Sequence, residues 1–301
     1  MPAQVEVKSV LNKTRRTDPW FLDDYTVNLY SGCAFNCLYC YIQGSKYGHH
    51  VAKTTTLKTN AIEVLSRQLR ARAQKKQYGV IVLSSVTDPY MPVDRKYKMT
   101  RQALEVILEN RFPVHIITKS DLIARDYDLL HAIDTQAIIP SHLSDRLDRG
   151  VIISYSFSTL DQHVAHIFEP GAPEPQRRLA SLQKTLAEDF YAGISLMPLL
   201  PHISDTGDHL DFLFSTFREF QVCYVLPASL TLYGEQLEDN KHQVLSAVQQ
   251  HFPQLHQKYL KFFSHNAQMP GYYRVALARK TRELCHINGL ENCINTLQSN
   301  N

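Results

Sequence analysis

The stretch that decides the fold is Gly32-Cys33-Ala-Phe-Asn-Cys37-Leu-Tyr-Cys40, which holds three of the six cysteines of the chain. It follows a strand-like run at 25–30, and Gly32 allows a sharp turn without steric cost. Thiolates gathered in one short loop indicate a metal site, either zinc or an iron–sulfur cluster. Structural zinc usually takes four ligands from two Cys-x-x-Cys pairs, and no second pair follows here.

Two other interpretations of the cysteines stay open at this point. One is a zinc-binding nucleic-acid interaction module, in which Cys223, Cys285 or Cys293 supplies a fourth ligand. The other is a chance cluster of structural cysteines, although such clusters in intracellular chains usually bind metal or do chemistry.

The composition indicates a globular protein of a reducing compartment. Apolar residues make up 44% of the 301 residues, and 32 basic against 29 acidic residues give a net charge of +3. That charge permits a nucleic-acid partner without requiring one. We find no apolar signal core, no run long enough for a membrane span and no disulfide framework, so we expect a cytoplasmic protein with no membrane partner.

Strand-like and helix-like segments alternate after the cysteine loop. Helices are expected from Asn60, from Thr100 as cap to Asn110, and over 121–133, 175–189 and 206–220, with Pro175 in a first turn. Six such units predict an α/β fold, a partial (β/α)6 barrel of parallel strands. The six strands are expected at 25–30, 80–84, 113–118, 151–154, 193–197 and 222–226.

The chain divides into a lead-in (1–24), the barrel core (25–240) and a helical C-terminal extension packed on the core (241–301). The helix that begins at Asn60 carries a basic face, which we interpret as a solvated surface rather than a nucleic-acid site. Its members are Arg67, Arg70, Arg72, Lys75 and Lys76.

Polar side chains follow several of the expected strands. They stand in the stretches 84–90, 119–121, 154–159 and 202–205. Ligands of parallel α/β folds bind at the carboxyl ends of the strands, where the cysteine loop also lies. Each stretch alone is ordinary turn and cap chemistry, but together they predict a ligand site.

These motifs carry a resemblance to a known family. The cysteine triplet with Tyr39 before its last member resembles the radical S-adenosylmethionine (AdoMet) enzymes. The closer resemblance is to the spore photoproduct lyase-like (DNA repair photolyase-like) family, over residues 24–205. The stretches that carry it are 32–41, 87–90, 118–120, 158–161, 168–171 and 178–179.

The resemblance implies the site residues. Cys33, Cys37 and Cys40 would ligate three irons of a [4Fe-4S] cluster, and AdoMet would chelate the fourth. Reductive cleavage of AdoMet would then yield a 5′-deoxyadenosyl radical that takes a hydrogen atom from the substrate. The residues expected around AdoMet are Ser84, Ser85 and Asp88 near its methionyl part, Lys119 and Ser156 at its carboxylate or ribose, and Arg178 as a carboxylate partner.

One departure from the family bears on the substrate. Spore photoproduct lyase has a cysteine hydrogen-atom donor where this chain has Ser85, whereas Tyr39 and Tyr41 match the tyrosines of its hydrogen relay. Cys223, expected after the sixth strand, is the candidate replacement donor. A damaged-DNA substrate and a C–H bond of an RNA, peptide or metabolite both stay open, and the resemblance implies an electron donor of ferredoxin or flavodoxin type. His49 and His50, beside the cysteine loop, are expected to be exposed rather than metal ligands.

Overall fold

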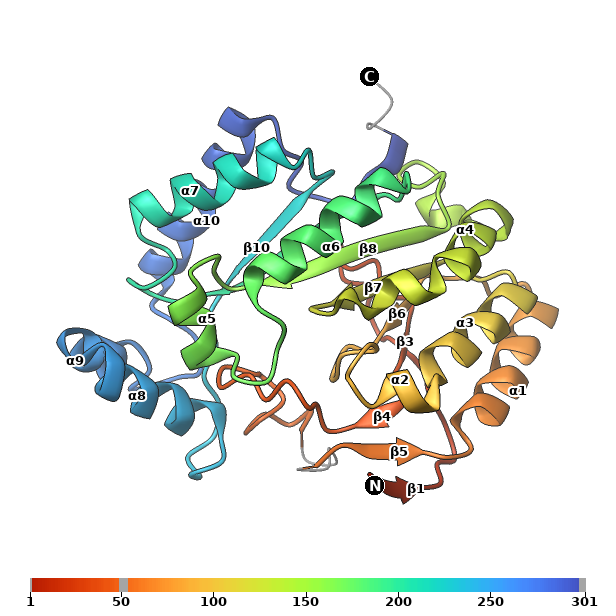
Figure 1. The fold of residues 1–301 in the computed structure, drawn as a ribbon, viewed down its shortest axis with the longest axis horizontal. Helices are drawn as coiled ribbons and strands as arrows, with labels where there is room; N and C mark the ends of the chain where they lie inside the picture. The colour runs from red at the N-terminus through yellow and green to blue at the C-terminus, as the bar shows by residue number, and fades with distance from the viewer. Residues whose placement is uncertain (1, 49–53, 298–301) are drawn as a thin grey trace.

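The computed structural model describes residues 2–48 and 54–297, and Figure 1 shows its ribbon. The main sheet is linear, with strand order β10-β9-β8-β7-β6-β3-β2, so it does not close on itself. Six of its strands run parallel, and β2 pairs antiparallel with β3 at one edge. The expected partial barrel is therefore confirmed. Its strands are β2 (Leu11–Lys13), β3 (Tyr25–Val27), β6 (Ile81–Leu83), β7 (Val114–Thr118), β8 (Val151–Phe157), β9 (Ala192–Leu199) and β10 (Val225–Ser229).

A small second sheet, of strand order β1-β5-β4, stands beside the first strand of the barrel. Its strands are β1 (Ala3–Val5), β4 (Tyr30–Ser31) and β5 (Thr56–Lys58). The lead-in thus contributes one short strand to each sheet. The run expected as a single strand at 25–30 is split, because β3 belongs to the barrel and β4 to the small sheet.

Helices cover the outer face of the sheet (Figure 1). Alternate residues of each strand point to opposite faces, so Ile81, Val114 and Val151, which lie side by side in register, pack on the helices. The helices are α1 (Ala61–Gln74), α2 (Asp94–Tyr97), α3 (Met99–Glu109), α4 (Tyr127–Gln136), α5 (Gln162–Phe168), α6 (Pro175–Ala187), α7 (Gly207–Glu219), α8 (Asn240–His251), α9 (Pro253–Phe262) and α10 (Gly271–Asn288), with short 3-10 turns at Asp121–Asp126 and Ser141–Leu143.

The inner face of the sheet has its own smaller core. Val80, Ile152 and Tyr224 pack there with Leu22 of the lead-in and Ile294 of the C-terminal segment. These contacts close the barrel at the amino ends of its strands, so the interior opens at the carboxyl ends. In the part of the chain described, no helix is long and apolar enough to cross a membrane.

Two helix starts differ from the expectation. Thr100 lies inside α3 rather than capping it, since Lys98, with φ +50°, ends α2 and α3 begins at Met99. The Thr100 hydroxyl instead donates to the backbone oxygen of Pro89 at 2.5 Å. The helix expected over 121–133 starts as a 3-10 turn, and α4 begins six residues later at Tyr127.

Candidate active site at the mouth of the barrel

The cysteine loop follows the first barrel strand and the short strand β4. Gly32 adopts φ +76°, which confirms the expected turn. The loop is fastened to the segment after α5, because the backbone N–H of Leu38 donates to Phe168 at 2.9 Å and that of Gly171 donates to Phe35 at 3.0 Å. A Cβ at Gly171 would lie 2.4 Å from a backbone oxygen of the loop, so only glycine fits this close approach.

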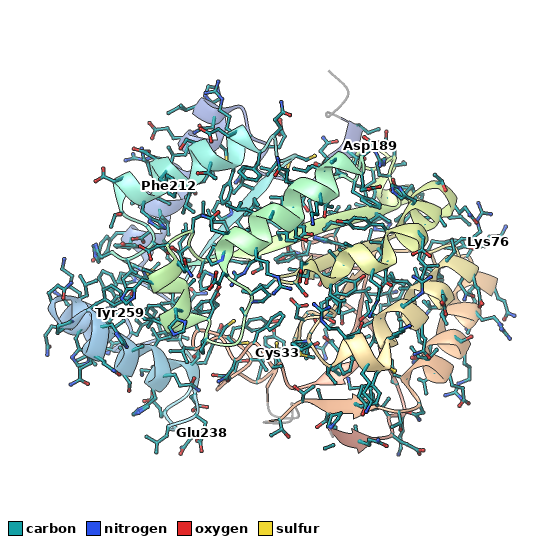
Figure 2. The ribbon with its side chains drawn as sticks, in the orientation of Figure 1. Cys33, Lys76, Asp189, Phe212, Glu238 and Tyr259 are labelled. Carbon is teal, nitrogen blue, oxygen red and sulfur yellow. The ribbon has the colours of Figure 1, made fainter. Side chains whose placement is uncertain are left out.

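The three thiols lie near one another in this loop. All three are partly exposed, yet burial raises the pKa of each, that of Cys33 to about 12. The charges of Cys33 and Cys40 add to the rise at Cys37, so the three sulfurs lie within electrostatic reach of one another. Figure 2 labels Cys33 near the centre of the molecule.

The spacing of the thiols bears on which metal they could hold. Across residues 2–48 and 54–297, no three His, Cys, Asp or Glu side chains converge on a point where a single ion could sit. Around one zinc the sulfurs would lie about 4 Å apart. The described residues therefore show no set of converging ligands of the kind that the zinc module requires.

Lys119, at the carboxyl end of β7, supplies the positive charge of the site. Its ammonium donates to the Ser156 hydroxyl at 2.6 Å and stands 3.9 Å from Glu169. Its charge lowers the pKa of both Cys37 and Cys40, although burial outweighs this effect. A lysine ammonium has three donors, so Lys119 can still bind an incoming carboxylate, while Ser156 orients it.

The loop after β6 offers hydroxyl groups without partners. Ser84 adopts φ +65°, an uncommon backbone region for a residue with a side chain. The side-chain oxygens of Ser84 and Thr87 are buried and have no hydrogen-bond partner among the described residues. Buried polar atoms are nearly always paired, so these two fit a polar ligand held between the loop and the thiols.

Two residues expected around AdoMet have other contacts. Both carboxylate oxygens of Asp88 are taken, by the N–H groups of Tyr90 (2.8 Å) and Lys119 (2.7 Å) and by the Thr118 hydroxyl. Asp88 therefore fixes the ends of β6 and β7 to each other. The Ser85 hydroxyl accepts from the Asn28 amide at 3.4 Å.

Glu169 is the residue of the site that sequence analysis missed. It is fully buried, and its carboxylate accepts from Tyr39, Arg178 and Ser158. Burial raises its pKa, but the charges of Lys119 and Arg178 and these hydrogen bonds outweigh burial and lower the pKa. The signal was present, because the quoted stretch 168–171 places this carboxylate between a phenylalanine and a Pro-Gly turn.

Arg178 is neither a surface side chain nor free for a ligand. It is 1% exposed, and it donates to Glu169 and to the backbone oxygens of Pro173 (2.7 Å) and Ser156 (3.1 Å). The expected role as carboxylate partner therefore needs correction, since the carboxylate that Arg178 binds is that of Glu169.

The two tyrosines beside Cys40 differ. The Tyr39 hydroxyl is buried and donates to Glu169, whereas Tyr41 is 40% exposed and donates to the backbone oxygen of Ser85 at 2.6 Å. Burial nevertheless raises the pKa of Tyr41.

Cys223 is not part of this site. It precedes β10 and its N–H donates to Ala192, the first residue of β9, at 2.9 Å. It therefore lies at the amino ends of the strands, against the inner core that closes the barrel. The expectation that it follows its strand and points toward the substrate was wrong. His49 and His50 lie outside the described residues.

Comparisons with known proteins agree with this geometry. The model of the radical SAM superfamily matches residues 27–213, more than half of the chain. An uncharacterized protein of Mycobacterium tuberculosis is 26% identical over 288 residues, which are 93% of this chain and 79% of that protein. A protein of Pseudomonas phage M6 named radical SAM Nalpha-GlyT isomerase is 24% identical over 66% of this chain and 38% of its own length.

Among solved structures, a spore photoproduct lyase variant superposes with a TM-score of 0.65. It is 15% identical, and the match covers 95% of this chain and 78% of the lyase. A second variant, which contains AdoMet and a dinucleoside spore photoproduct, has the same TM-score and coverage. At this identity the likeness establishes the fold. Because the family model spans the loop with the three cysteines, the chain belongs to the radical SAM superfamily, whose members use a [4Fe-4S] cluster and AdoMet.

Proposed function

We propose that this radical SAM enzyme holds its cluster through Cys33, Cys37 and Cys40 and cleaves AdoMet reductively. The observation that carries the proposal is the loop of three cysteines that follows β3 and β4, whose thiols lie within electrostatic reach of one another and of the Lys119 ammonium. When bound, the reduced cluster supplies one electron that splits AdoMet into methionine and a radical able to take hydrogen from a substrate. A small reductant protein, of ferredoxin or flavodoxin type, would deliver that electron.

The chain's own residues would orient AdoMet and keep water away. Lys119, held by Ser156, would bind the AdoMet carboxylate as an ion pair. The unpaired hydroxyls of Ser84 and Thr87 would meet its polar groups. Glu169 and Arg178 lie behind these groups and fix Tyr39 and Lys119 without reaching the ligand.

The test is anaerobic reconstitution of the protein with iron and sulfide. We expect about four irons per chain, and methionine with 5′-deoxyadenosine after dithionite is added. Cys37→Ala should lose both, whereas Cys223→Ala, at the far end of the barrel, should keep both. A Cys37→Ala protein that kept its iron and its cleavage activity would sink the proposal.

For the substrate we propose a nucleic acid. The fold shared with spore photoproduct lyase, solved with a dinucleoside spore photoproduct, supports this class, with splitting of a thymine lesion as the lyase-like reaction. A second reaction, modification of a C–H bond without a thiol donor, is favoured by Ser85. Among the described residues, the cysteines outside the triplet are Cys223, Cys285 and Cys293. Cys223, the candidate thiol donor, is remote from the mouth.

Mass spectrometry separates the two reactions. DNA that carries the spore photoproduct should release repaired thymine only if the chain is a lyase. Undamaged DNA or RNA that gains or loses mass, with one 5′-deoxyadenosine formed per event, would identify a modifying enzyme. A peptide or metabolite substrate would leave all the nucleic acids unchanged.

A further inference from the structure

A row of cations lies on the flank of the barrel, away from the cysteine loop. Arg67, Arg70, Lys75 and Lys76 of α1 and its C-terminal end are exposed. Within the described residues, none of the four forms an ion pair with a carboxylate. Helix α1 is the outermost helix on the right of Figure 1, and Figure 2 labels Lys76 at that rim, far from Cys33.

The lead-in extends this row. Lys13 is exposed and pairs in register with Tyr25, whose hydroxyl donates to the backbone oxygen of Gln77 at 2.9 Å, next to Lys76. The lead-in is fastened to α1 because Gln68 accepts from two of its backbone N–H groups at 3.0 Å. Arg15 and Arg16 follow Lys13 and are also exposed. We call these seven side chains the basic strip: Lys13, Arg15, Arg16, Arg67, Arg70, Lys75 and Lys76.

The strip borders an open groove of about 650 Å³ between α1 and α3. Arg67, Arg70 and Gln74 line it on the α1 side. Two carboxylates also line it, Glu63 of α1 and Glu109 of α3. The excess of positive charge therefore lies toward the C-terminal end of α1 and the adjoining lead-in. From Arg67 to the C-cap Lys75 the helix advances by eight residues, or about 12 Å, which spans about three to four phosphates of one nucleic-acid strand.

The loops around the barrel mouth have the opposite character. Glu235 and Glu238 are exposed in the loop before α8, and Asp161 and Glu174 are exposed at the two ends of the segment that carries Glu169. The strip is therefore the more favourable of the two surfaces for a polyanion.

We propose that the basic strip binds the sugar–phosphate backbone of a nucleic acid, without reading its sequence. This deepens the proposed function, because it rests on a nucleic-acid substrate for the same enzyme. Nucleic acid fits better than an anionic membrane, since Ala71 is the one apolar side chain that α1 exposes and membrane-surface helices insert larger ones.

The experiment measures binding of a fluorescein-labelled 20-nucleotide single strand and of the matching duplex by anisotropy at several salt concentrations. The test variant is Arg67→Glu/Arg70→Glu in the reconstituted full chain. The matched control is Arg279→Glu/Arg282→Glu, two exposed arginines with the same spacing on α10. Circular dichroism melting of both variants verifies that each is folded.

We expect the test variant to bind at least tenfold more weakly at low salt. The magnitude of the slope of log K against log salt should fall by about 1.4 for the single strand and about 1.8 for the duplex, as the loss of two phosphate contacts requires. The control should bind within twofold of the parent. Equal losses in both variants, or parent-like binding by the test variant, would overturn the proposal, as would binding to phosphatidylserine vesicles in place of nucleic acid.

The readouts separate this inference from the proposed function. AdoMet cleavage without substrate should be the same in the test variant and the parent, because the strip is remote from the thiols. Loss of cleavage in the parent would refute the proposed function whatever the anisotropy shows. AdoMet cleavage with no nucleic-acid binding at any salt concentration would refute the strip and the nucleic-acid substrate, but not the cleavage reaction.

Discussion

Glu169 and Arg178 form an ion pair that is fully buried directly behind the cysteine loop. The same carboxylate accepts the hydroxyl proton of Tyr39, 130 residues earlier in the chain. The pair therefore ties the loop that holds the thiols to the start of α6. Glu169 stands 3.9 Å from the Lys119 ammonium, too far for a hydrogen bond, so this lysine keeps donors for a ligand.

Glu169→Gln should destabilise the protein strongly. The variant leaves the Arg178 guanidinium buried without a counter-charge, which costs about 3–5 kcal/mol. Urea unfolding of the cluster-free protein measures the loss without interference from iron. Glu188→Gln is the matched control, because Glu188 directly follows α6 as Glu169 directly follows α5, but is exposed, with a contact to His131 of 3.4 Å. Its cost should stay below about 1 kcal/mol. Equal costs would show that the buried pair does not stabilise the fold.

Lys119→Met should weaken AdoMet binding at least tenfold while the iron content stays near that of the parent. The change removes the charge that we assign to the AdoMet carboxylate but touches no thiol. Isothermal titration of the reconstituted protein measures the affinity, and Lys119→Arg should recover part of it. Lys96→Met, at an exposed lysine of α2, is the control. Unchanged affinity in Lys119→Met would remove this residue from the site.

Acid should destabilise the barrel through His115. Its Nδ1–H donates to the Phe21 backbone oxygen at 2.9 Å, and its Nε2 accepts from the Ser154 hydroxyl at 2.8 Å, so the buried ring is neutral. Burial lowers its pKa to about 4, against 6.5 in the unfolded chain. Below pH 6.5 the unfolded chain therefore binds more protons, and stability that is complete above that pH is lost as the pH falls toward 4.

Between pH 7.5 and 5.0 this loss should amount to about 2 kcal/mol. Urea unfolding of the parent and of His115→Gln at the two pH values isolates the contribution. The variant should be less stable at pH 7.5 but should lose about 2 kcal/mol less on acidification. Parallel losses in the two proteins would contradict a neutral buried ring.

Asn240→Ala should weaken the attachment of the cysteine loop to α8. The Asn240 amide donates to the backbone oxygens of Tyr39 (3.2 Å) and Thr231 (3.1 Å), and its oxygen accepts from Tyr233. The variant should release iron to a chelator several times faster than the parent. Asn288→Ala, at the end of α10, removes one local hydrogen bond and should release iron at the parent's rate. Equal rates of iron release in the two variants would show that α8 does not hold the cysteine loop in place.

The sequence predicted the parts of the fold that have a local signal. The six strands, Pro175 in a first turn and the turn at Gly32 all follow from short-range patterns. The prediction of Thr100 as a helix cap was wrong, because α3 begins directly after Lys98, whose φ is positive. No pattern in the sequence predicts that backbone conformation. The division of the chain at residue 240 stays a prediction.

The candidate site was predicted less completely, because its contacts join distant residues. The thiols and Lys119 could be placed from the motifs that follow single strands. The role of Glu169 could not be predicted, because it depends on hydrogen bonds from three other segments of the chain. Arg178 was assigned to a ligand because a guanidinium suits any carboxylate, and only the fold identifies which one it meets.

The measurement that tests the central claim most directly is the electron paramagnetic resonance spectrum of the reconstituted, dithionite-reduced protein with and without AdoMet. We expect the signal of a reduced [4Fe-4S] cluster, whose shape changes when AdoMet is added because AdoMet binds the iron that the three cysteines leave open. A protein that shows no cluster signal, or a signal that AdoMet leaves unchanged, would contradict the account.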